Sequence, residues 1–234
     1  MQDQPTLTSW LIVSQRVERA LLAFAGLCAL LLALTMGLSS IGAGRWRAFD
    51  EWLLRALRTA ADPGVAIGSR SFQIAVRDMT ALGGVLPLTV LVAIVAVYLM
   101  LKGHWRTGGA VVASVALGVL ASQVLKSLID RGRPDIVPQL VPEISGSFPS
   151  GHAMMSAIVY LTLGAMLARL EPERAVRRFV IGTAMAITVA VGLSRVYLGV
   201  HWPSDVIGGW CLGALWVIAV SRTLDAAIRR VNGA

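Results

Sequence analysis

Charged residues are scarce in this 234-residue sequence, at 15% of the chain, whereas 56% of the residues are hydrophobic. The mean hydropathy is +0.71, and a soluble domain normally carries about a quarter of charged residues. The shortage of charge therefore argues against a soluble globular protein. The hydrophobic residues form runs long enough to cross the roughly 30 Å hydrocarbon core of a bilayer as helices. These runs are too long and too continuous for the strands of a membrane β-barrel.

Lysine is nearly absent, with only Lys102 and Lys126, so the net charge of +8 comes from arginine. No basic tract with interleaved aromatic residues occurs, which argues against a nucleic-acid partner. We expect the arginines to orient the helices and to meet anionic head groups or substrates. Cysteine is equally rare. Cys28 and Cys211 both fall inside apolar runs, where a thiol behaves as a small hydrophobic group.

Six apolar runs predict an all-α integral membrane bundle of six transmembrane helices in a single domain over residues 1–234. The runs cover residues 20–40, 85–101, 107–129, 152–170, 179–194 and 205–219. The first follows Arg16 and Arg19 as in a signal sequence, but it exceeds the 7 to 15 residues of a signal core, so we predict a retained helix. Residues 1–19 are predicted to be a cytoplasmic interfacial segment.

The first outer loop is predicted to span residues 44–84 and to contain an amphipathic helix. In the stretch "FDEWLLRALR", apolar residues recur at helical spacing, with charged residues on the opposite face. Such a helix is expected to lie on the membrane surface. The tryptophans near the ends of the predicted spans, Trp52 and Trp202 among them, are expected to join the interfacial aromatic belt.

The basic residues indicate the orientation of the bundle, because cytoplasmic loops are enriched in them. With six spans, one face receives both termini and the following basic residues: Arg16, Arg19, Lys102, Arg106, Arg169, Arg174, Arg177, Arg178, Arg222, Arg229 and Arg230. We therefore predict that this face is cytoplasmic. The arginines of the 44–84 loop, on the opposite face, weaken this asymmetry but are partly offset by acidic residues.

The other titratable residues gather at helix ends on the predicted outer face. They are Lys126, Arg131, Arg133, His152, Arg195, His201 and Asp205. Ionisable groups at membrane depth are costly and generally line a functional cavity. Since the local sequence offers the cations few anions to pair with, the cluster predicts an anionic ligand, and phosphate is the obvious one. Arginine binds phosphate oxygens with two parallel hydrogen bonds.

The stretch "PSGH" adds backbone N–H donors for phosphate, because it lies directly before a predicted helix. Two histidines beside a phosphate site can divide the work of hydrolysis, one as nucleophile and one as general acid. His201 lies four residues before Asp205, so one helical turn is expected to bring the carboxylate to the imidazole. This spacing favours His201 as the nucleophile and His152 as the acid.

Three stretches in order, "KSLIDRGRP", "PSGH" and "SRVYLGVHWPSD", over residues 126–205, resemble the motifs of the type 2 phosphatidic acid phosphatase superfamily of membrane enzymes. The resemblance implies that His201 is the nucleophile, Asp205 its partner and His152 the general acid. It implies phosphate binding by Lys126, Arg133, Ser150, Gly151 and Arg195, with no metal or cofactor. Arg131 lies between two matched positions without matching one, and we expect it to face solvent or head groups.

The resemblance also implies the function: metal-independent hydrolysis of a lipid-linked phosphate, of the polyprenyl diphosphate, phosphatidylglycerol phosphate or phosphatidate type. The expected location is a bacterial inner membrane, with the site facing the exterior. A lipid phosphotransferase and a lipid A phosphatase remain open alternatives. A vanadium haloperoxidase shares the motifs, but those relatives are soluble. An anion transporter would leave both histidines and Asp205 without a role, and its polar residues would line a path across the membrane.

Overall fold

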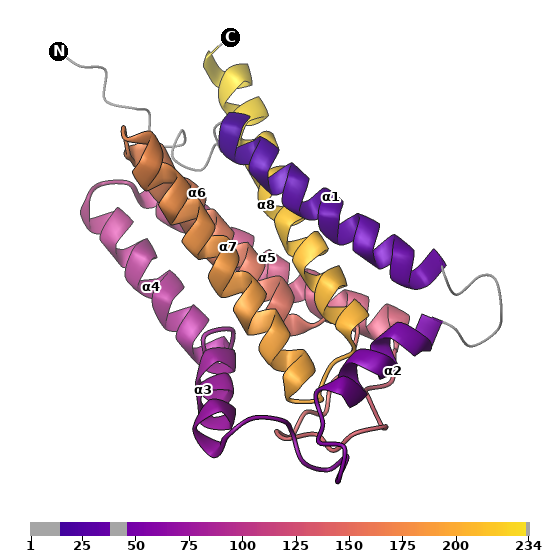
Figure 1. Cartoon of the computed structure of the whole chain (residues 1–234). Coiled ribbons are helices and arrows are strands. Elements are labelled where there is room, and N and C mark those ends of the chain that lie inside the picture. Colours follow the sequence, from indigo (N-terminus) through magenta and orange to yellow (C-terminus); the bar gives the residue numbers. More distant parts are fainter. Residues whose placement is uncertain (1–14, 38–45, 233–234) are drawn as a thin grey trace.

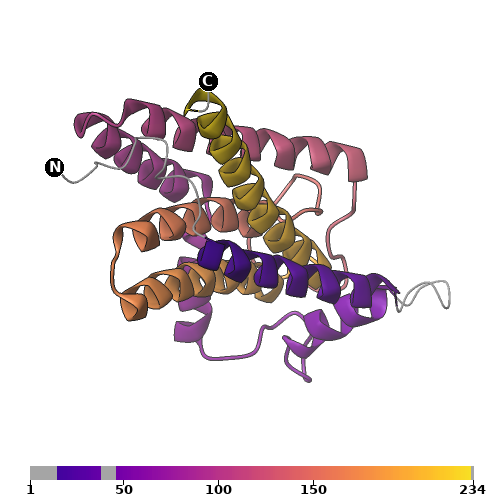
Figure 2. The same ribbon diagram turned by 90° about the horizontal axis from the view of Figure 1, so that it is seen from above.

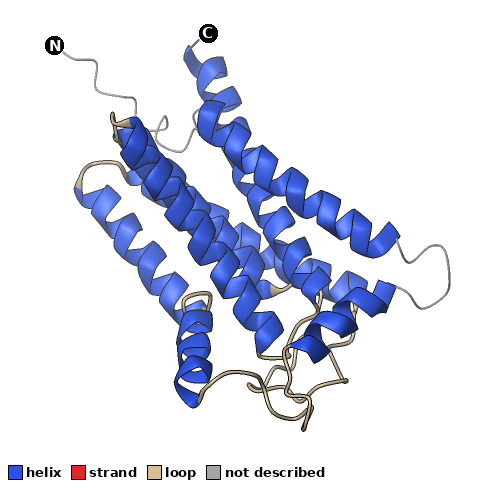
Figure 3. Ribbon diagram, in the orientation of Figure 1, coloured by secondary structure: helices blue, strands red, loops and turns tan. Residues whose placement is uncertain are grey.

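The computed structural model describes residues 15–37 and 46–232, and this part of the chain is helical apart from its loops (Figure 3). Figure 1 labels the helices, which are α1 (Gln15–Gly37), α2 (Trp46–Ala56), α3 (Arg70–Ala81), α4 (Val85–Leu101), α5 (Trp105–Ile129), α6 (Gly151–Leu170), α7 (Arg174–Tyr197) and α8 (Pro203–Asn232). The predicted all-α membrane fold is confirmed.

The centre of the bundle is formed by α6, α7 and α8, which pack against one another. Helix α1 lies along α8, α4 along α5, and α3 against α7 (Figures 1 and 2). Small residues line the central contacts, including Ala157, Ala184 and Ala214, which are all buried. Small side chains allow membrane helices to approach closely, where packing replaces the hydrophobic effect as the source of stability.

The prediction of six spans holds if one broken span is counted. Helices α1, α5, α6, α7 and α8 are each long and apolar enough to cross a membrane, and α3 and α4 together form a sixth candidate with a bend of 47°. The predicted second span, residues 85–101, is thus only the α4 part of a bent pair. Gly83 lies at the break, where a Cβ atom would come within 2.4 Å of Val191 and 3.3 Å of His152. Only glycine fits this approach.

Several predicted boundaries need correction. The 44–84 loop holds two helices, α2 and α3, instead of one. Helix α7 begins five residues before the predicted residue 179, and α8 extends well beyond residue 219. Residues 1–14 of the predicted interfacial segment and residues 44–45 of the loop lie outside the described part, as do the side chains of Arg169, Arg229 and Arg230. Helix ends extend past the apolar core because polar residues continue them into water.

The two ends of the bundle differ in character. The start of α1, the end of α8 and the α4–α5 and α6–α7 connections share one end, while the long loop after α5 and the α7–α8 connection share the other (Figure 1). At the first end, Arg222 of α8 pairs with Glu18 of α1 at 2.6 Å. The second end carries the predicted site.

Candidate active site

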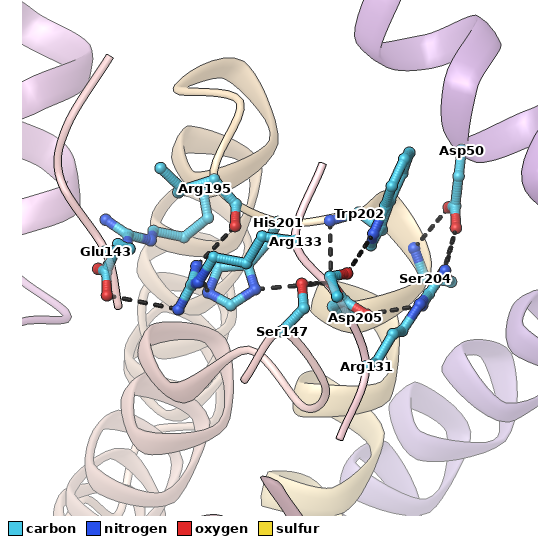
Figure 4. A network of polar contacts seen from close by, with 12 residues as sticks. Asp50, Arg131, Arg133, Glu143, Ser147, Arg195, His201, Trp202, Ser204 and Asp205 are labelled. Carbon is cyan, nitrogen blue, oxygen red and sulfur yellow. Dashed lines mark hydrogen bonds and ion pairs between the residues drawn. The ribbon is translucent and has the colours of Figure 1, made fainter. Parts of the chain in front are cut away.

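Four of the predicted site residues, Arg133, Arg195, His201 and Asp205, lie close together around the connection between α7 and α8 (Figure 4). His201 lies in this connection and is 1% exposed. Its Nε2 atom is 3.3 Å from Nη1 of Arg133. Because a guanidinium group only donates hydrogen bonds, this contact leaves Nε2 as the acceptor and assigns the ring proton to Nδ1.

Asp205 lies beside the other ring nitrogen of His201, at 3.6 Å between Oδ2 and Nδ1, slightly longer than a hydrogen bond. The spacing predicted that His201 and Asp205 share one helical turn. They do not, because α8 begins only at Pro203. The fully buried carboxylate also accepts from the Trp202 N–H at 2.9 Å and from the Ser147 hydroxyl. Both donors bind Oδ2, the oxygen that faces the imidazole.

Glu143 stands between two of the predicted phosphate-binding arginines (Figure 4). Its carboxylate contacts Nη2 of Arg195 and lies 3.4 Å from Nη2 of Arg133. The expectation that these cations have too few anions nearby to pair with is therefore wrong for Arg133 and Arg195. Burial tends to raise the pKa of Glu143, but the charges of Arg195 and Arg133 outweigh it and hold that pKa below its ordinary value. Glu143 is consequently an ionised group at the place where an anionic ligand was expected.

Arg195 is nearly inaccessible to solvent, at 2% exposure. Its Nη1 donates to the Thr80 hydroxyl of α3 at 3.2 Å, and its buried Nε has no hydrogen-bond partner among the described residues. One donor of the guanidinium group therefore remains for another acceptor. A buried polar atom without a partner costs free energy unless a ligand satisfies it.

Lys126 and Arg133 are held by the loop that follows α5. The Lys126 ammonium donates to the Ser145 hydroxyl at 2.9 Å, and Arg133 contacts the same hydroxyl at 3.2 Å. The Cβ position of Gly151 lies 3.7 Å from the Lys126 nitrogen. The structure thus brings Lys126, Arg133 and the start of α6 to one place, as the motifs predicted.

Ser150 and His152 complete the set at the start of α6. The Ser150 hydroxyl is fully buried and has no hydrogen-bond partner in the described part of the chain. The Ser150 N–H donates to the Asp205 carbonyl at 3.1 Å, so the "PSGH" stretch is joined to the start of α8. His152 lies beside Gly83 at the break between α3 and α4. No direct bond joins it to His201 among the described residues.

Arg131 was expected to face solvent or head groups, and this expectation is wrong. Its guanidinium group donates to Asp205 at 2.6 Å and to Asp50 of α2 at 2.8 Å. It lies over the ring of Trp202, which is 2% exposed and donates to the Gly132 carbonyl. Trp202 is therefore a buried packing residue, and its predicted place in the interfacial belt is also wrong.

Sequence reasoning missed Glu143 and Asp50. Glu143 lies in an irregular loop between two motifs, where no spacing marks it. Asp50 did leave a signal, because it precedes Leu54 by four residues and so shares the face of α2 that is buried, with both side chains fully inaccessible. A carboxylate on a buried helix face needs a partner, which makes it a candidate for a polar site.

Burial lowers the pKa of His201 to about 4, although the neighbouring Asp205 opposes the shift. A free histidine titrates near pH 6.5. Since the folded protein disfavours the charged ring, we expect His201 to stay neutral from pH 7 down to about pH 5 and to gain its proton only below that. The check is a pH titration of the ring ¹⁵N shifts of labelled histidine in detergent micelles, with His201→Asn assigning the signal. A midpoint near 6.5 for that signal would contradict the prediction.

In the described ranges, no group of three or more His, Cys, Asp or Glu side chains is arranged to hold a metal ion. The charged groups of the site are the cations Lys126, Arg131, Arg133 and Arg195, of which the arginines pair with Glu143, Asp205 and Asp50.

Comparison with known proteins finds one matching family and several similar proteins. The model of the PAP2 superfamily matches residues 107–229. The chain is similar to phosphatidylglycerophosphatase B of Bacillus subtilis (strain 168), with 46% identity over 112 residues, which cover 47% of this chain and 54% of that protein. It is also similar to the undecaprenyl-diphosphatase of Sulfolobus acidocaldarius, with 30% identity over 140 residues, covering 58% and 63%. The matches thus span less than two thirds of either relative.

A solved structure is similar over nearly its whole length. The crystal structure of a transmembrane PAP2 type phosphatidylglycerolphosphate phosphatase from Bacillus subtilis matches with a TM-score of 0.72 and 31% identity. The match covers 88% of this chain and 98% of that one. It includes the helical bundle outside residues 107–229, so the likeness is not limited to the motif-bearing helices.

Proposed function

Because the chain belongs to the PAP2 superfamily, we propose that it is a membrane phosphatase that hydrolyses a lipid-linked phosphate monoester or diphosphate without a metal ion. The observation that carries the proposal is the setting of His201. Its unprotonated Nε2 faces the Arg133 guanidinium group, and its Nδ1 faces the Asp205 carboxylate. A nucleophile needs an unprotonated nitrogen, and Nε2 is one whose electron pair can attack phosphorus once Arg133 turns its hydrogen bond to the phosphoryl oxygens. The charged product needs an anion behind it, which Asp205 supplies.

In the first step, Nε2 of His201 attacks phosphorus in line with the leaving oxygen. The P–N bond forms as the P–O bond to the lipid breaks, and the leaving oxygen takes a proton from His152. Asp205 stabilises the positive charge that develops on the imidazole of His201. Because negative charge spreads over the phosphoryl oxygens in the transition state, the placement of the cations around them is expected to supply much of the rate.

In the second step, His152 takes a proton from water, and the resulting hydroxide attacks the phosphoryl group. The P–N bond breaks, inorganic phosphate leaves, and His201 returns to its neutral form. The acceptor is the only difference from a phosphotransferase, in which a lipid hydroxyl takes the place of water. That alternative predicts labelled phosphate in an acceptor lipid and little free phosphate.

The phosphoryl oxygens are proposed to bind Arg133, Arg195, Lys126, the Ser150 hydroxyl and the Gly151 N–H. The unpartnered Arg195 Nε and Ser150 hydroxyl support this assignment, since both are buried donors. Glu143 holds two of the same guanidinium groups, so phosphate and carboxylate compete for them. Substrate binding therefore requires Glu143 to give up these contacts.

An apolar groove beside the site suits a lipid chain. It has a volume of about 410 Å³ between α2, α3 and α7 and is lined by residues that include Leu53, Phe72, Met79 and Leu193. The lining also includes Ser194 and Val196, the neighbours of Arg195. A chain in this groove would place its head group next to the cations. The proposed substrates are polyprenyl diphosphate, phosphatidylglycerol phosphate or phosphatidate, with lipid A phosphate as an alternative.

The cellular setting follows from the charges at the other end of the bundle. We infer that this basic end faces the cytoplasm and that the site faces the exterior of a bacterial inner membrane. A substrate in the outer leaflet would then reach the site from the side.

The test is phosphate release by the purified protein from a panel of these lipids, with EDTA present and His201→Ala in parallel. Release that survives EDTA and is lost in the variant is the expected result, and the panel then ranks the substrates. Absence of release from every lipid by folded protein would overturn the hydrolase. Labelled phosphate recovered in an acceptor lipid would replace it by the phosphotransferase, and anion flux that survives in His201→Ala vesicles would favour a transporter.

A further inference from the structure

The carboxylate beside His201 is connected to the amphipathic helix α2 by consecutive ion pairs. Nη1 of Arg131 lies 2.6 Å from Oδ1 of Asp205, and Nη2 of Arg131 lies 2.8 Å from Oδ2 of Asp50 (Figure 4). Asp50 and Asp205 are both completely buried. One guanidinium group thus bridges two buried carboxylates that lie 155 positions apart in the sequence.

Asp50 also holds the start of α8. The Ser204 N–H donates to Oδ1 of Asp50 at 2.9 Å, and the Ser204 hydroxyl donates to Oδ2 at 2.5 Å. A carboxylate at a helix start accepts free N–H groups and is favoured by the helix dipole. Asp50 therefore connects α2 both to Arg131 and to the helix that carries Asp205.

Neither the motifs nor the family match includes α2. The match begins at residue 107, and the first motif begins at Lys126. The opposite face of α2 presents Trp52, 63% exposed, and Phe49, whose ring centroid lies 6.1 Å from that of Trp52. The helix that supplies Asp50 thus turns aromatic side chains outward, as helices at a membrane interface do.

We propose that Asp50 is a positioning residue for the catalytic carboxylate, an inference that rests on the proposed function. With one arm of Arg131 bound to Asp50, only the other arm reaches Asp205, at Oδ1. Oδ2 then remains directed at Nδ1 of His201. Without Asp50, the planar fork of Arg131 is free to bind both oxygens of Asp205, the geometry that arginine and carboxylate favour. The second arm would then pull Oδ2 away from the imidazole, against the Trp202 N–H and the Ser147 hydroxyl that also bind this oxygen.

The test compares Asp50→Asn, which keeps the size but loses the charge, with Asp50→Glu, which keeps the charge. Asp78→Asn, an exposed carboxylate on α3, is the matched control. We expect Asp50→Asn to lower kcat by about 10- to 100-fold with KM changed less than about threefold. Asp50→Glu should recover part of kcat, and Asp78→Asn should match the wild type.

A second readout does not depend on activity. The ¹⁵N and ¹H shifts of the His201 Nδ1–H group report its contact with Asp205, and they should move in Asp50→Asn and stay in Asp78→Asn. Shifts unchanged in Asp50→Asn, or an equal loss of kcat in Asp50→Asn and Asp50→Glu, would overturn the positioning role. If the wild type releases no phosphate while Asp50→Asn still shows the shift change, the proposed function is wrong and the positioning role stands.

A different observation, at the opposite end of the bundle, carries a second inference. A groove of about 850 Å³ lies between the N-terminal parts of α1 and α7. Its floor is apolar and includes Val17, Ala20, Ile181 and Met185. Four arginines surround this floor: Arg16, Arg174, Arg177 and Arg178. None of the four forms an ion pair with a carboxylate of the described residues.

We infer that this groove binds an anionic phospholipid of the adjacent leaflet. Guanidinium groups match the phosphate of the head group, and the apolar floor between two spanning helices matches an acyl chain. Basic pockets between transmembrane helices on the cytoplasmic side are suited to such lipids. The site is separate from the catalytic residues, which lie at the other end of the bundle (Figure 1).

Native mass spectrometry of the full chain with phosphatidylglycerol or phosphatidylcholine tests this site. The wild type should retain phosphatidylglycerol at least about tenfold better than phosphatidylcholine, since each basic residue adds to the attraction for an anionic head group. The triple variant Arg174→Gln, Arg177→Gln and Arg178→Gln should lose this preference. The charge-matched variant Arg19→Gln, Lys102→Gln and Arg106→Gln should keep it. An equal loss in both variants, or no preference in the wild type, would overturn the site.

Discussion

Replacement of His201 by asparagine is expected to reduce phosphate release by at least about 10³-fold, the largest effect of any single change in this protein. Asparagine keeps a polar side chain of similar reach but has no nitrogen with a free electron pair for attack. The buried neighbours Arg133 and Asp205 are expected to remain in place. The fall in phosphate release would therefore come from the missing nucleophile and not from unfolding of the protein. The measurement is kcat/KM on the preferred lipid, with the melting temperature recorded in the same detergent.

Two companion variants sharpen this experiment. His104→Asn, at the α4–α5 turn on the other end of the bundle, should retain the wild-type rate. His152→Asn should slow the reaction. Acid-labile labelled phosphate should be recoverable on His201 in the His152→Asn variant, and no such label should be found in the His201→Asn variant. If His201→Asn keeps more than about a tenth of the wild-type rate, His201 is not the nucleophile.

Replacement of Arg195 by lysine is expected to lower kcat/KM by about 10²-fold, the second largest effect. The positive charge is retained, but the planar fork is lost. Nη1 of Arg195 donates to Thr80, and Nε together with Nη2, once Glu143 gives up its contact, are proposed to bind the phosphoryl group. A lysine ammonium cannot make all three contacts from the same position. The loss of binding free energy should be larger for the transition state than for the bound substrate, because negative charge spreads over the phosphoryl oxygens in the transition state.

Arg106→Lys is the control for this second change. Arg106 lies over the Trp105 ring at the opposite end of the bundle, 5.2 Å from its centroid, so the same substitution there is conservative for the site. Its kcat/KM should equal that of the wild type. An Arg195→Lys variant with unchanged kcat/KM would show that a positive charge is sufficient at this position and that the planar guanidinium group is not needed to bind the phosphate.

The position of the site was predictable because of how a membrane chain must fold. Without water, each span must form its own backbone hydrogen bonds, so apolar runs mark helices and polar motifs mark their ends. Lys126, Arg133, Ser150, His152, Arg195, His201 and Asp205 all follow from this reasoning, and the structure gathers them at one end. The break between α3 and α4 was not predictable, because it depends on Gly83 meeting α7.

The sequence by itself determined the helical membrane fold, the end at which the polar residues meet and the residues that carry the motifs. Only the tertiary structure decided how their charges are paired. Glu143 joins Arg195 across 52 positions, and Asp50 joins Arg131 across 81. Such pairs depend on where loops and distant helices bring side chains, and no local periodicity encodes them. They arise because a buried charge is costly until an opposite charge from elsewhere in the chain meets it.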